Sequence, residues 1–419
     1  MVERNSMSTN TLISTEVQLL LEDLIKKLDV QNYSIDTTAA TTKGDNFQGV
    51  IANAKVKGEN KQGEEVTFNF IVKSAPRNGI FRATTPMSKI YDREIYVYKR
   101  VLKEFDDFQI EKKIEIPFRS YAKYYESSND DMNEALILEN MNKHGFFGVD
   151  RYQSLNYEQT KLVLKEYGKL HALSFAMRLQ KPAVFNELAE NAQETYLHNI
   201  NTDHAYSSFC DFLEKCFSVF DPINDHLLLM KLKKWQINLR EVVMKTIETD
   251  FNNPYYVIGH GDCWINNFLF KYENARLEPK GVCFLDWQFS RLGSPVLDIS
   301  YFLFCCTDKE IRRKYDNLIK EYYNSLSSFL REFGEDPEEV FPLHVLKEHL
   351  KEYSIFGLFM ALFVLLLNFS SPEEIPDLNQ YAKDDCVIDS FKYDIKNLGQ
   401  FQERVRDIII DFFKFGYDF

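Results

Sequence analysis

The sequence predicts an α+β protein of two lobes: a small N-terminal lobe with an antiparallel sheet and one helix, and a large, mostly helical C-terminal lobe. Segments that alternate apolar and polar residues dominate residues 33–138, which is typical of strands. After Gly145, apolar residues recur at every third or fourth position, which is typical of helices. With 419 residues, 45% of them hydrophobic, the chain has room for a two-lobed enzyme or for two or three domains.

The N-terminal lobe is predicted to begin with a helix over residues 15–28 that packs on the following lobe. Thr15 and Gln18 form a capping-box pattern ahead of a leucine stripe. Four strands of a five-stranded sheet are predicted at residues 50–56, 66–72, 114–124 and 135–138. A further helix is expected over residues 89–105.

The C-terminal lobe is predicted to contain long helices at residues 157–177, 228–242, 309–333, 345–369 and 395–415. Residues 355–369 form the most apolar run, but these 15 residues are fewer than the ~20 that cross a bilayer. A buried helix is therefore expected here.

Charge and cysteine usage restrict the partners and the compartment. A net charge of −13 and a pI near 5.3 argue against nonspecific binding to nucleic acid or to an anionic membrane. Seven cysteines without metal-type C-x-x-C spacing favour a reducing environment. Residues 1–10 are polar and lack an apolar signal core. We expect a cytoplasmic protein, and nothing in the sequence indicates an obligate protein partner.

The most informative segment delivers three polar side chains after two apolar runs. Val257–Ile258 leads into His260-Gly261-Asp262, Asn267 follows five residues later, and a second apolar run ends at Asp286. Phosphoryl transfer uses these residue types: a carboxylate accepts the proton of the attacking hydroxyl, while an amide oxygen and a carboxylate hold Mg²⁺. The sequence thus predicts Asp262 as the catalytic base and Asn267 and Asp286 as Mg²⁺ ligands. The alternative is two buried strands whose acids cap turns.

A lysine and a glutamate upstream have the types and order of a nucleotide-binding pair. Lys73 points away from the Phe68–Phe70 face of its strand, and Glu94 follows 21 residues later on the predicted helix. In nucleotide kinases a strand lysine contacts the α/β phosphates and a helix glutamate holds it. Taken individually, they would be a surface lysine and a solvated glutamate; together with Asp262 and Asp286 they indicate a nucleotide site.

Two further segments are predicted to contact the nucleotide. Gly44 and Asn46 belong to a glycine-containing stretch before a strand, where the backbone could approach a phosphate closely, although an ordinary turn has the same pattern. Glu139 and Met141 follow an apolar strand, where backbone groups of a hinge would meet adenine. These boundaries divide the chain into an N-terminal extension (1–32), a nucleotide-binding lobe (33–138), a hinge (139–142) and a helical lobe (143–419).

Two residues are predicted to support the site structurally. His260 is expected to pack beneath the Asp262 loop, because it lacks the partners of a metal or nucleophile-activating site. Asp298 lies near the start of an apolar helix, in a position that suits a cap.

These residues together resemble the ecdysteroid kinase-like family (also called CHK kinase-like), within the aminoglycoside phosphotransferase/choline kinase-like superfamily. The resemblance covers roughly residues 40–370. Its most specific motifs are His260-Gly261-Asp262-Cys263-Trp264-Ile265-Asn266-Asn267-Phe268 and Leu285-Asp286-Trp287-Gln288. Two positions depart from the family pattern: Cys263 replaces a frequent leucine and Gly49 a common serine, the latter leaving the loop more flexible.

The resemblance implies a protein-kinase-like fold and an ATP- and Mg²⁺-dependent small-molecule O-kinase. Lys73 would be the phosphate lysine, Glu94 its partner, Asp262 the base, and Asn267 and Asp286 the metal ligands. The acceptor would be an ecdysteroid or another apolar, foreign alcohol. Aromatic residues of the helical lobe would either line a sterol-sized pocket or form core: Phe302, Phe304, Phe356, Phe359, Met360 and Phe363.

Three other functions are considered. A non-catalytic member of the fold would bind nucleotide or steroid without turnover, but the complete set of site residues argues against it. A choline-type kinase would share the chemistry with a different acceptor. A protein kinase is disfavoured because the chain lacks D-F-G and A-P-E motifs.

Overall fold

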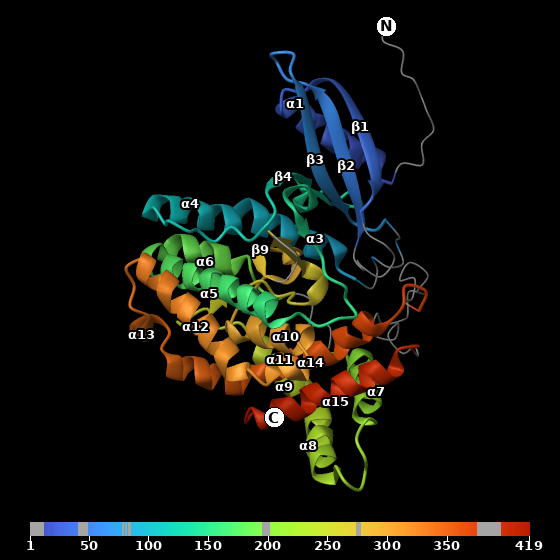
Figure 1. The fold of residues 1–419 in the computed structure, drawn as a ribbon, viewed down its shortest axis with the longest axis vertical. Helices are drawn as coiled ribbons and strands as arrows, with labels where there is room; N and C mark the ends of the chain where they lie inside the picture. The colour runs from blue at the N-terminus through green and yellow to red at the C-terminus, as the bar shows by residue number, and fades with distance from the viewer. Residues whose placement is uncertain are drawn as a thin grey trace.

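The N-terminal lobe is built on a five-stranded antiparallel sheet, and the computed structural model describes residues 12–40, 49–77, 79, 82, 85–194, 202–273, 278–374 and 395–419. The strands lie in the order β1-β2-β3-β5-β4. Their bounds are β1 (Gln31–Ala39), β2 (Val50–Glu59), β3 (Glu65–Ser74), β4 (Tyr124–Ser128) and β5 (Ala135–Glu139). Figure 1 shows this sheet as a separate lobe above the helical part of the chain.

The predicted strand over residues 114–124 is wrong, because β4 begins only at Tyr124. The side chain of Gln109 competes for the backbone of this segment. Its Oε1 accepts the N–H of Phe118 at 2.6 Å, and its Nε2 donates to the Phe118 carbonyl at 3.2 Å. Since a side chain occupies both polar groups of Phe118, this residue has none left for a strand ladder.

Helix α1 (Thr15–Lys27) packs on one face of the sheet. Val17, Leu21 and Leu24 are buried against Phe70 and Val72 of β3. The helix cap is Ser14, whose hydroxyl accepts the N–H of Val17, rather than the predicted Thr15.

A second helical segment lies between β3 and β4 in the chain. It runs through α3 (Met87–Tyr96), the π-helical turn η1 (Val97–Val101) and α4 (Leu102–Lys112) without a break. The predicted helix over residues 89–105 is therefore real but longer. Its buried side carries Glu94, which is 1% exposed.

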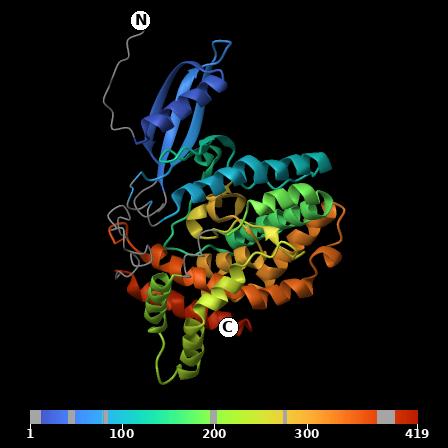
Figure 2. The same cartoon turned by 180° about the vertical axis from the view of Figure 1, so that it is seen from behind.

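The C-terminal lobe is mostly helical, which together with the sheet lobe confirms the predicted fold class (Figures 1 and 2). Its helices are α5 (Tyr157–Gln180), α6 (Pro182–Glu190), α7 (Asp203–Phe217), α8 (His226–Ile237), α9 (Leu239–Ile247), α10 (Val296–Cys306), α11 (Lys309–Arg312), α12 (Tyr315–Glu332), α13 (Pro337–Val340), α14 (Leu343–Phe369) and α15 (Leu398–Lys414). Two predicted helices are each divided in two. A break at Asn238 separates α8 from α9, and residues 313–314 separate α11 from α12.

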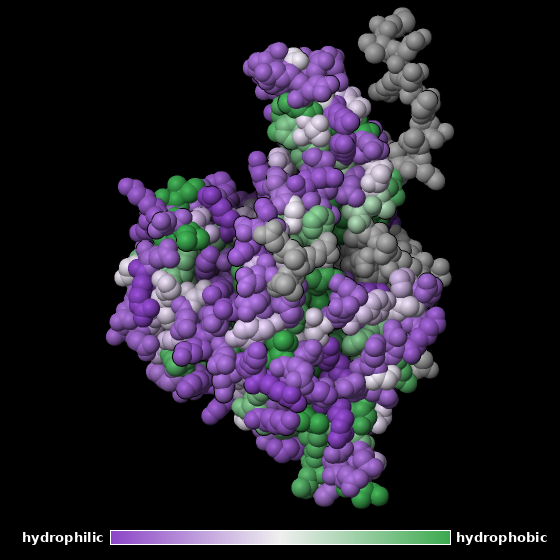
Figure 3. All heavy atoms as spheres, in the orientation of Figure 1, coloured by the Kyte–Doolittle hydropathy of each residue, from purple (hydrophilic) through white to green (hydrophobic). Residues whose placement is uncertain are grey.

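The helical stretch Pro337–Phe369 is the one described segment long and apolar enough to cross a membrane, and 78% of its most apolar window is buried inside the protein. This agrees with the predicted buried helix. Gly357 of α14 lies against α10: a Cβ there would meet the backbone carbon of Ser300 at 2.3 Å. Exposed apolar side chains gather around α8, where Ile223, Leu227 and Met230 are 66–82% exposed. Figure 3 shows apolar residues at the lower tip of the molecule.

Short strands carry the polar residues of the central segment. β7 (Val257–Ile258) pairs with β10 (Leu292–Gly293), and β8 (Phe268–Tyr272) pairs with both β6 (Phe146–Phe147) and β9 (Pro279–Phe284). Asp262 therefore follows the buried strand β7, and Asp286 follows β9 and contacts Lys73 of β3.

Candidate active site

The carboxylate of Asp262 lies in the loop after β7 and is held at both oxygens. The Tyr301 hydroxyl donates to Oδ1 at 3.1 Å, and Nδ2 of Asn267 donates to Oδ2 at 2.8 Å. Asp262 is 6% exposed. A side chain fixed in this way presents a carboxylate in one orientation to a reacting hydroxyl.

A backbone hydrogen bond holds Asn267 against the residue that precedes Asp286. The N–H of Leu285 donates to the carbonyl of Asn267 at 2.9 Å. Asn267 uses its amide N–H groups on the carboxylate and carbonyl of Asp262, so its amide oxygen is the end turned away from the base. Asp286 has a positive φ of 65°, a conformation that aspartate tolerates better than most residues.

Lys73 connects the two lobes at this point. Its Nζ donates to Oε2 of Glu94 at 2.7 Å and to Oδ1 of Asp286 at 2.8 Å. The backbone N–H of Trp287 also donates to Glu94. The structure thus brings together the predicted phosphate lysine, its helix partner and one predicted metal ligand.

Burial sets the protonation of these groups. Burial disfavours the charged form of Lys73, but the carboxylates of Asp286 and Glu94 outweigh it, so the pKa of Lys73 lies above its ordinary value. Burial, and then the negative charge of Asp286, raise the pKa of Asp262 to about 7, although hydrogen bonds from Asn267 and Tyr301 act in the opposite direction. A carboxylate with a pKa near neutrality is matched to the task of a general base.

Asp298 fixes the loop that carries Asp262. Its carboxylate accepts the N–H of His260 at 2.7 Å, the N–H of Gly261 at 2.9 Å and the ring of His171 at 3.2 Å. Burial alone would raise the pKa of Asp298, but these donors lower it to about 2. The prediction that Asp298 caps its own helix is wrong, because α10 begins at Val296 with no side-chain cap and this carboxylate binds the neighbouring loop instead.

His260 joins the two motifs from beneath, where it was predicted to pack. It is fully buried, with Nε2 2.9 Å from the carbonyl of Leu285 and Nδ1 3.2 Å from the Tyr167 hydroxyl. Burial lowers the pKa of His260, so the ring is neutral, donates to Leu285 and accepts from Tyr167. It ties the Asp262 loop to the strand that ends at Asp286.

At two positions, neighbouring atoms lie so close to the backbone that glycine is required. Gly261 has φ +88°, and a Cβ there would meet the Phe289 carbonyl at 2.0 Å. At Gly49 a Cβ would lie 2.4 Å from the Tyr91 hydroxyl and 2.8 Å from the Ser74 carbonyl. This backbone leaves little room for the serine common in the family, and the expectation that Gly49 makes the loop more flexible stays a prediction.

The remaining predicted nucleotide contacts are placed only in part. Gly44 and Asn46 lie outside the described residues. In the predicted hinge, the N–H of Glu139 donates to Lys123 and the N–H of Asn140 to Asn69. The N–H of Asn142 donates to the side chain of Asn140 at 3.0 Å, and the N–H of Met141 has no acceptor found in the described part of the chain.

The donor set of Asn267 and Asp286 fits Mg²⁺. One amide oxygen and one carboxylate are hard ligands, and Mg²⁺ completes its octahedron with water and phosphate oxygens. In the described ranges, no three His, Cys, Asp or Glu side chains cluster closely enough to hold a metal by themselves. The two residues therefore suit an ion that arrives with a nucleotide.

Sequence reasoning missed two residues of the site. Tyr301 lies among apolar neighbours on α10. Its hydroxyl could have indicated a polar contact, because a buried tyrosine O–H needs a hydrogen-bond partner. Arg93 precedes Glu94 and donates to the carbonyls of Ser290 and Gln193, both at 2.6 Å. Contacts to backbone carbonyls leave no signature in the sequence.

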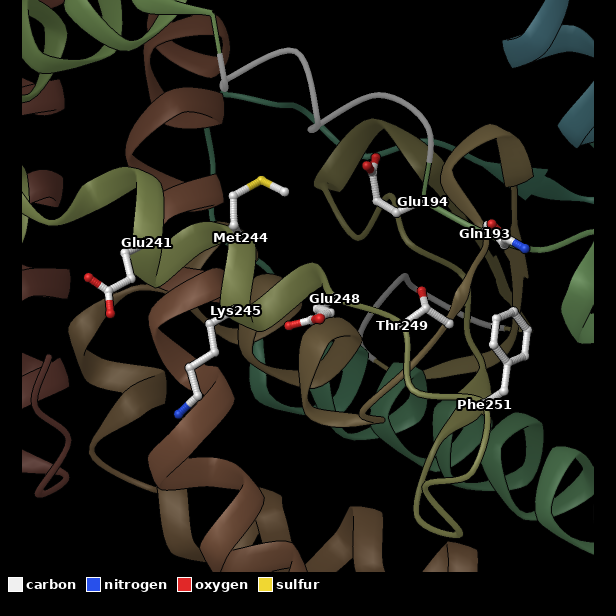
Figure 4. A pocket seen from close by; sticks show the side chains of 8 residues that line it. All are labelled: Gln193, Glu194, Glu241, Met244, Lys245, Glu248, Thr249 and Phe251. Atoms are coloured by element: carbon white, nitrogen blue, oxygen red, sulfur yellow. The ribbon is translucent and has the colours of Figure 1, made fainter.

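The aromatic residues considered for a sterol pocket are mainly core. Phe302 and Phe304 are fully buried, and Phe356 and Phe359 are at most 3% exposed. A cavity of about 650 Å³ lies elsewhere, between α9 and the segment after α6 (Figure 4). It is lined by Gln193, Glu194, Glu241, Met244, Lys245, Glu248, Thr249 and Phe251. None of the predicted site residues lines it.

Comparison with known proteins identifies the family. The model of the ecdysteroid kinase-like family matches residues 43–335. Two solved GDP complexes of aminoglycoside 2'-phosphotransferase-IIIa are similar, one of a point mutant (TM-score 0.42, 10% identity, 84% of this chain and 89% of that chain) and one of the wild type (TM-score 0.35, 11% identity, 83% and 99%). No curated protein matches the chain. Since the family model covers more than half of its residues, the chain belongs to the ecdysteroid kinase-like family, a family of small-molecule kinase-like enzymes.

Proposed function

We propose that the protein is an ATP-dependent O-kinase that phosphorylates a hydroxyl of an ecdysteroid or another apolar, foreign alcohol. The observation that carries the proposal is the convergence at Lys73, whose Nζ bonds Glu94 from the sheet lobe and Asp286 from the helical lobe. The fixed, buried carboxylate of Asp262 beside Asn267 supports it.

The proposed reaction is a single in-line transfer. Asp262 accepts the proton of the acceptor hydroxyl, whose oxygen forms a bond to the γ-phosphorus of ATP. The bond from the γ-phosphorus to the β–γ bridging oxygen breaks, and ADP leaves with that electron pair. Lys73 would exchange its contact with Asp286 for the α/β phosphates, and Glu94 would keep it aimed.

Mg²⁺ would bind Asn267 and Asp286 and neutralise charge on the phosphates. In the hinge, the N–H of Met141 is the donor best suited to adenine, because the N–H groups of Glu139 and Asn140 are already used. Within the described residues all six cysteines are unpaired, which supports the proposed cytoplasmic location.

A phosphorylation screen tests the proposal. The purified protein is incubated with Mg-ATP and ecdysteroids, choline, aminoglycosides or plant-derived alcohols, and products are detected by the mass gain of one phosphate. Asp262→Asn serves as the control and should lower turnover more than ~100-fold while keeping nucleotide binding. Nucleotide binding without phosphorylation of any acceptor would favour a non-catalytic member, and a product with choline alone would favour a choline-type kinase.

A further inference from the structure

Arg291 is a buried cation that the proposed reaction does not use. It lies just before β10 and is 5% exposed. Its Nε and Nη2 atoms are buried and have no acceptor among the described residues. Leaving guanidinium N–H groups unpaired costs free energy. The buried Arg151, by contrast, donates to the carbonyls of Leu367 and Ser370.

A second arginine increases the positive charge at this place. Among the described residues, the acceptors of Arg93 are two neutral carbonyls, those of Ser290 and Gln193. Burial lowers the pKa of Arg93 to about 10, Glu194 opposes this shift, and the charge of Arg291 adds to it. Glu194 is thus a carboxylate whose charge acts on Arg93, and it partly offsets the positive charge at this place.

Aromatic contacts relate Arg291 to the base. Its guanidinium carbon lies 4.7 Å from the ring centre of Phe356. The ring of Phe356 lies 6.3 Å from that of Tyr301, edge to face, and the hydroxyl of Tyr301 binds Asp262. Arg291 is therefore separated from the phosphoryl-transfer point by two rings, which suits a distal group of a bound acceptor better than the transferred phosphate.

We propose that Arg291, assisted by Arg93, binds an anionic group of the acceptor, a carboxylate or sulfate, at a distance from the hydroxyl that is phosphorylated. This assignment rests on the proposed function and specifies an acceptor whose body is apolar and which also carries an acidic group away from the hydroxyl. A planar guanidinium pairs with such a group through two parallel hydrogen bonds, which would satisfy the orphaned Nε and Nη2 atoms.

Binding of inorganic sulfate tests the anion site without any turnover. At constant ionic strength, sulfate should stabilise the wild type saturably in thermal unfolding, and Arg291→Met should raise the apparent Kd at least ~10-fold. Arg291→Lys, which keeps the charge, should fall between them. Arg178→Met is the matched control: Arg178 also has unpaired Nε and Nη2 atoms and contacts a phenylalanine ring, but it should leave sulfate binding unchanged.

Two more variants separate the sources of anion binding. Lys73→Met should still be stabilised by sulfate. If sulfate stabilises Arg291→Met but not Lys73→Met, the sulfate binds at the nucleotide phosphate site and the proposal is overturned. Glu194→Gln removes the neutralising carboxylate and should tighten sulfate binding a few-fold. Weaker binding in Glu194→Gln, or no saturable effect in the wild type, would also overturn it.

A second experiment measures phosphorylation of two acceptors, a neutral sterol and its sulfate or hemisuccinate ester. Arg291→Met should lower kcat/KM for the acidic acceptor at least ~10-fold relative to the neutral one, with KM for ATP unchanged. An equal loss for both acceptors would contradict the assignment. If no acceptor is phosphorylated, the kinase proposal fails, and sulfate titration still decides whether Arg291 binds anions.

Discussion

At the scale of single residues, two buried aspartates have pKa values shifted in opposite directions, because burial raises both and only Asp298 has donors that outweigh it. Burial and the negative charge of Asp286 outweigh the two neutral donors of Asp262, so its pKa rises to about 7. Asp298 has two backbone N–H groups and a histidine, so its pKa falls to about 2. One carboxylate is able to accept a proton near neutral pH and the other remains charged.

The first prediction concerns the pH dependence of kcat/KM. The base works only when deprotonated, so kcat/KM should rise with pH through about 7. The Tyr301 hydroxyl donates to the ionised carboxylate and lowers its pKa, so Tyr301→Phe should move this rise to higher pH. Steady-state kinetics from pH 5 to 9 would check both. A rise that stays in place or moves to lower pH in Tyr301→Phe would contradict the assigned contact.

The second prediction concerns Asp298 and stability. Its folded-state pKa is depressed, so its contribution, about 2 kcal/mol, is fully present above the ordinary value of 3.8 and disappears as pH falls through about 2. Asp298→Asn should therefore destabilise the protein at pH 7, and the difference from wild type should shrink at pH 3. Denaturant unfolding at both pH values measures this, and an equal difference at both would refute the linkage.

At the scale of elements, the site is assembled where β3, α3 and the segment after β9 meet. Lys73 is the penultimate residue of β3, Glu94 lies on the buried side of α3, and Asp286 follows β9. The helical lobe supports this junction through α10, which supplies both Tyr301 and Asp298 and packs against α14.

The third prediction is that Lys73 and Glu94 act as one unit. If Glu94 serves to aim Lys73, then Lys73→Met and Glu94→Gln should each lower kcat/KM, and the double variant should be little worse than Lys73→Met alone. A double-mutant cycle on kcat/KM with Mg-ATP measures the coupling. Fully additive losses would show that the two side chains act independently.

The fourth prediction concerns the contact between α10 and α14. A methyl group at Gly357 would meet the backbone of Ser300 at 2.3 Å, so Gly357→Ala should lower the free energy of unfolding by about 1–3 kcal/mol. Gly399→Ala is the control, because that helical glycine of α15 has no atom within 4 Å of the added carbon and alanine favours a helix. Comparable losses in the two variants would exclude close packing as the cause.

At the scale of the whole molecule, the ion pair of Lys73 and Asp286 joins the two lobes at the candidate site. Lys73 and Asp286 are 213 positions apart, yet their side chains are 2.8 Å apart. The same two groups are proposed to bind the phosphates and Mg²⁺. Nucleotide binding would therefore replace a contact between the lobes with contacts to the ligand.

The fifth prediction follows from this exchange. Asp286→Ala should weaken Mg-ATP binding much more than binding of metal-free ATP, because it removes a metal ligand and also releases Lys73 for the phosphates. Isothermal titration with and without Mg²⁺ measures the two affinities. An unchanged Mg²⁺ dependence in the variant would remove Asp286 from the metal site.

The α+β class, the α1 helix and the order of the site residues could be predicted from the sequence, because periodicity and residue type are local properties. Most errors had a tertiary cause. The side chain of Gln109 hydrogen-bonds the backbone of Phe118, and β4 begins later than predicted. The carboxylate of Asp298 accepts hydrogen bonds from the loop after β7 rather than from its own helix. Such contacts join residues 9 to 38 positions apart, and local propensity does not specify them.

The sequence by itself determined which chemical groups are candidates for the site: the proposed base, the proposed metal ligands and the lysine–glutamate pair. Only the tertiary structure decided how those groups are tuned. The negative charge of Asp286 beside Asp262, the Tyr301 hydroxyl on that carboxylate and the unpaired guanidinium of Arg291 all arise from packing between distant segments. The physical reason is that burial and the electrostatic field at a group depend on where the fold places it in space, whereas the residue type is given by the sequence.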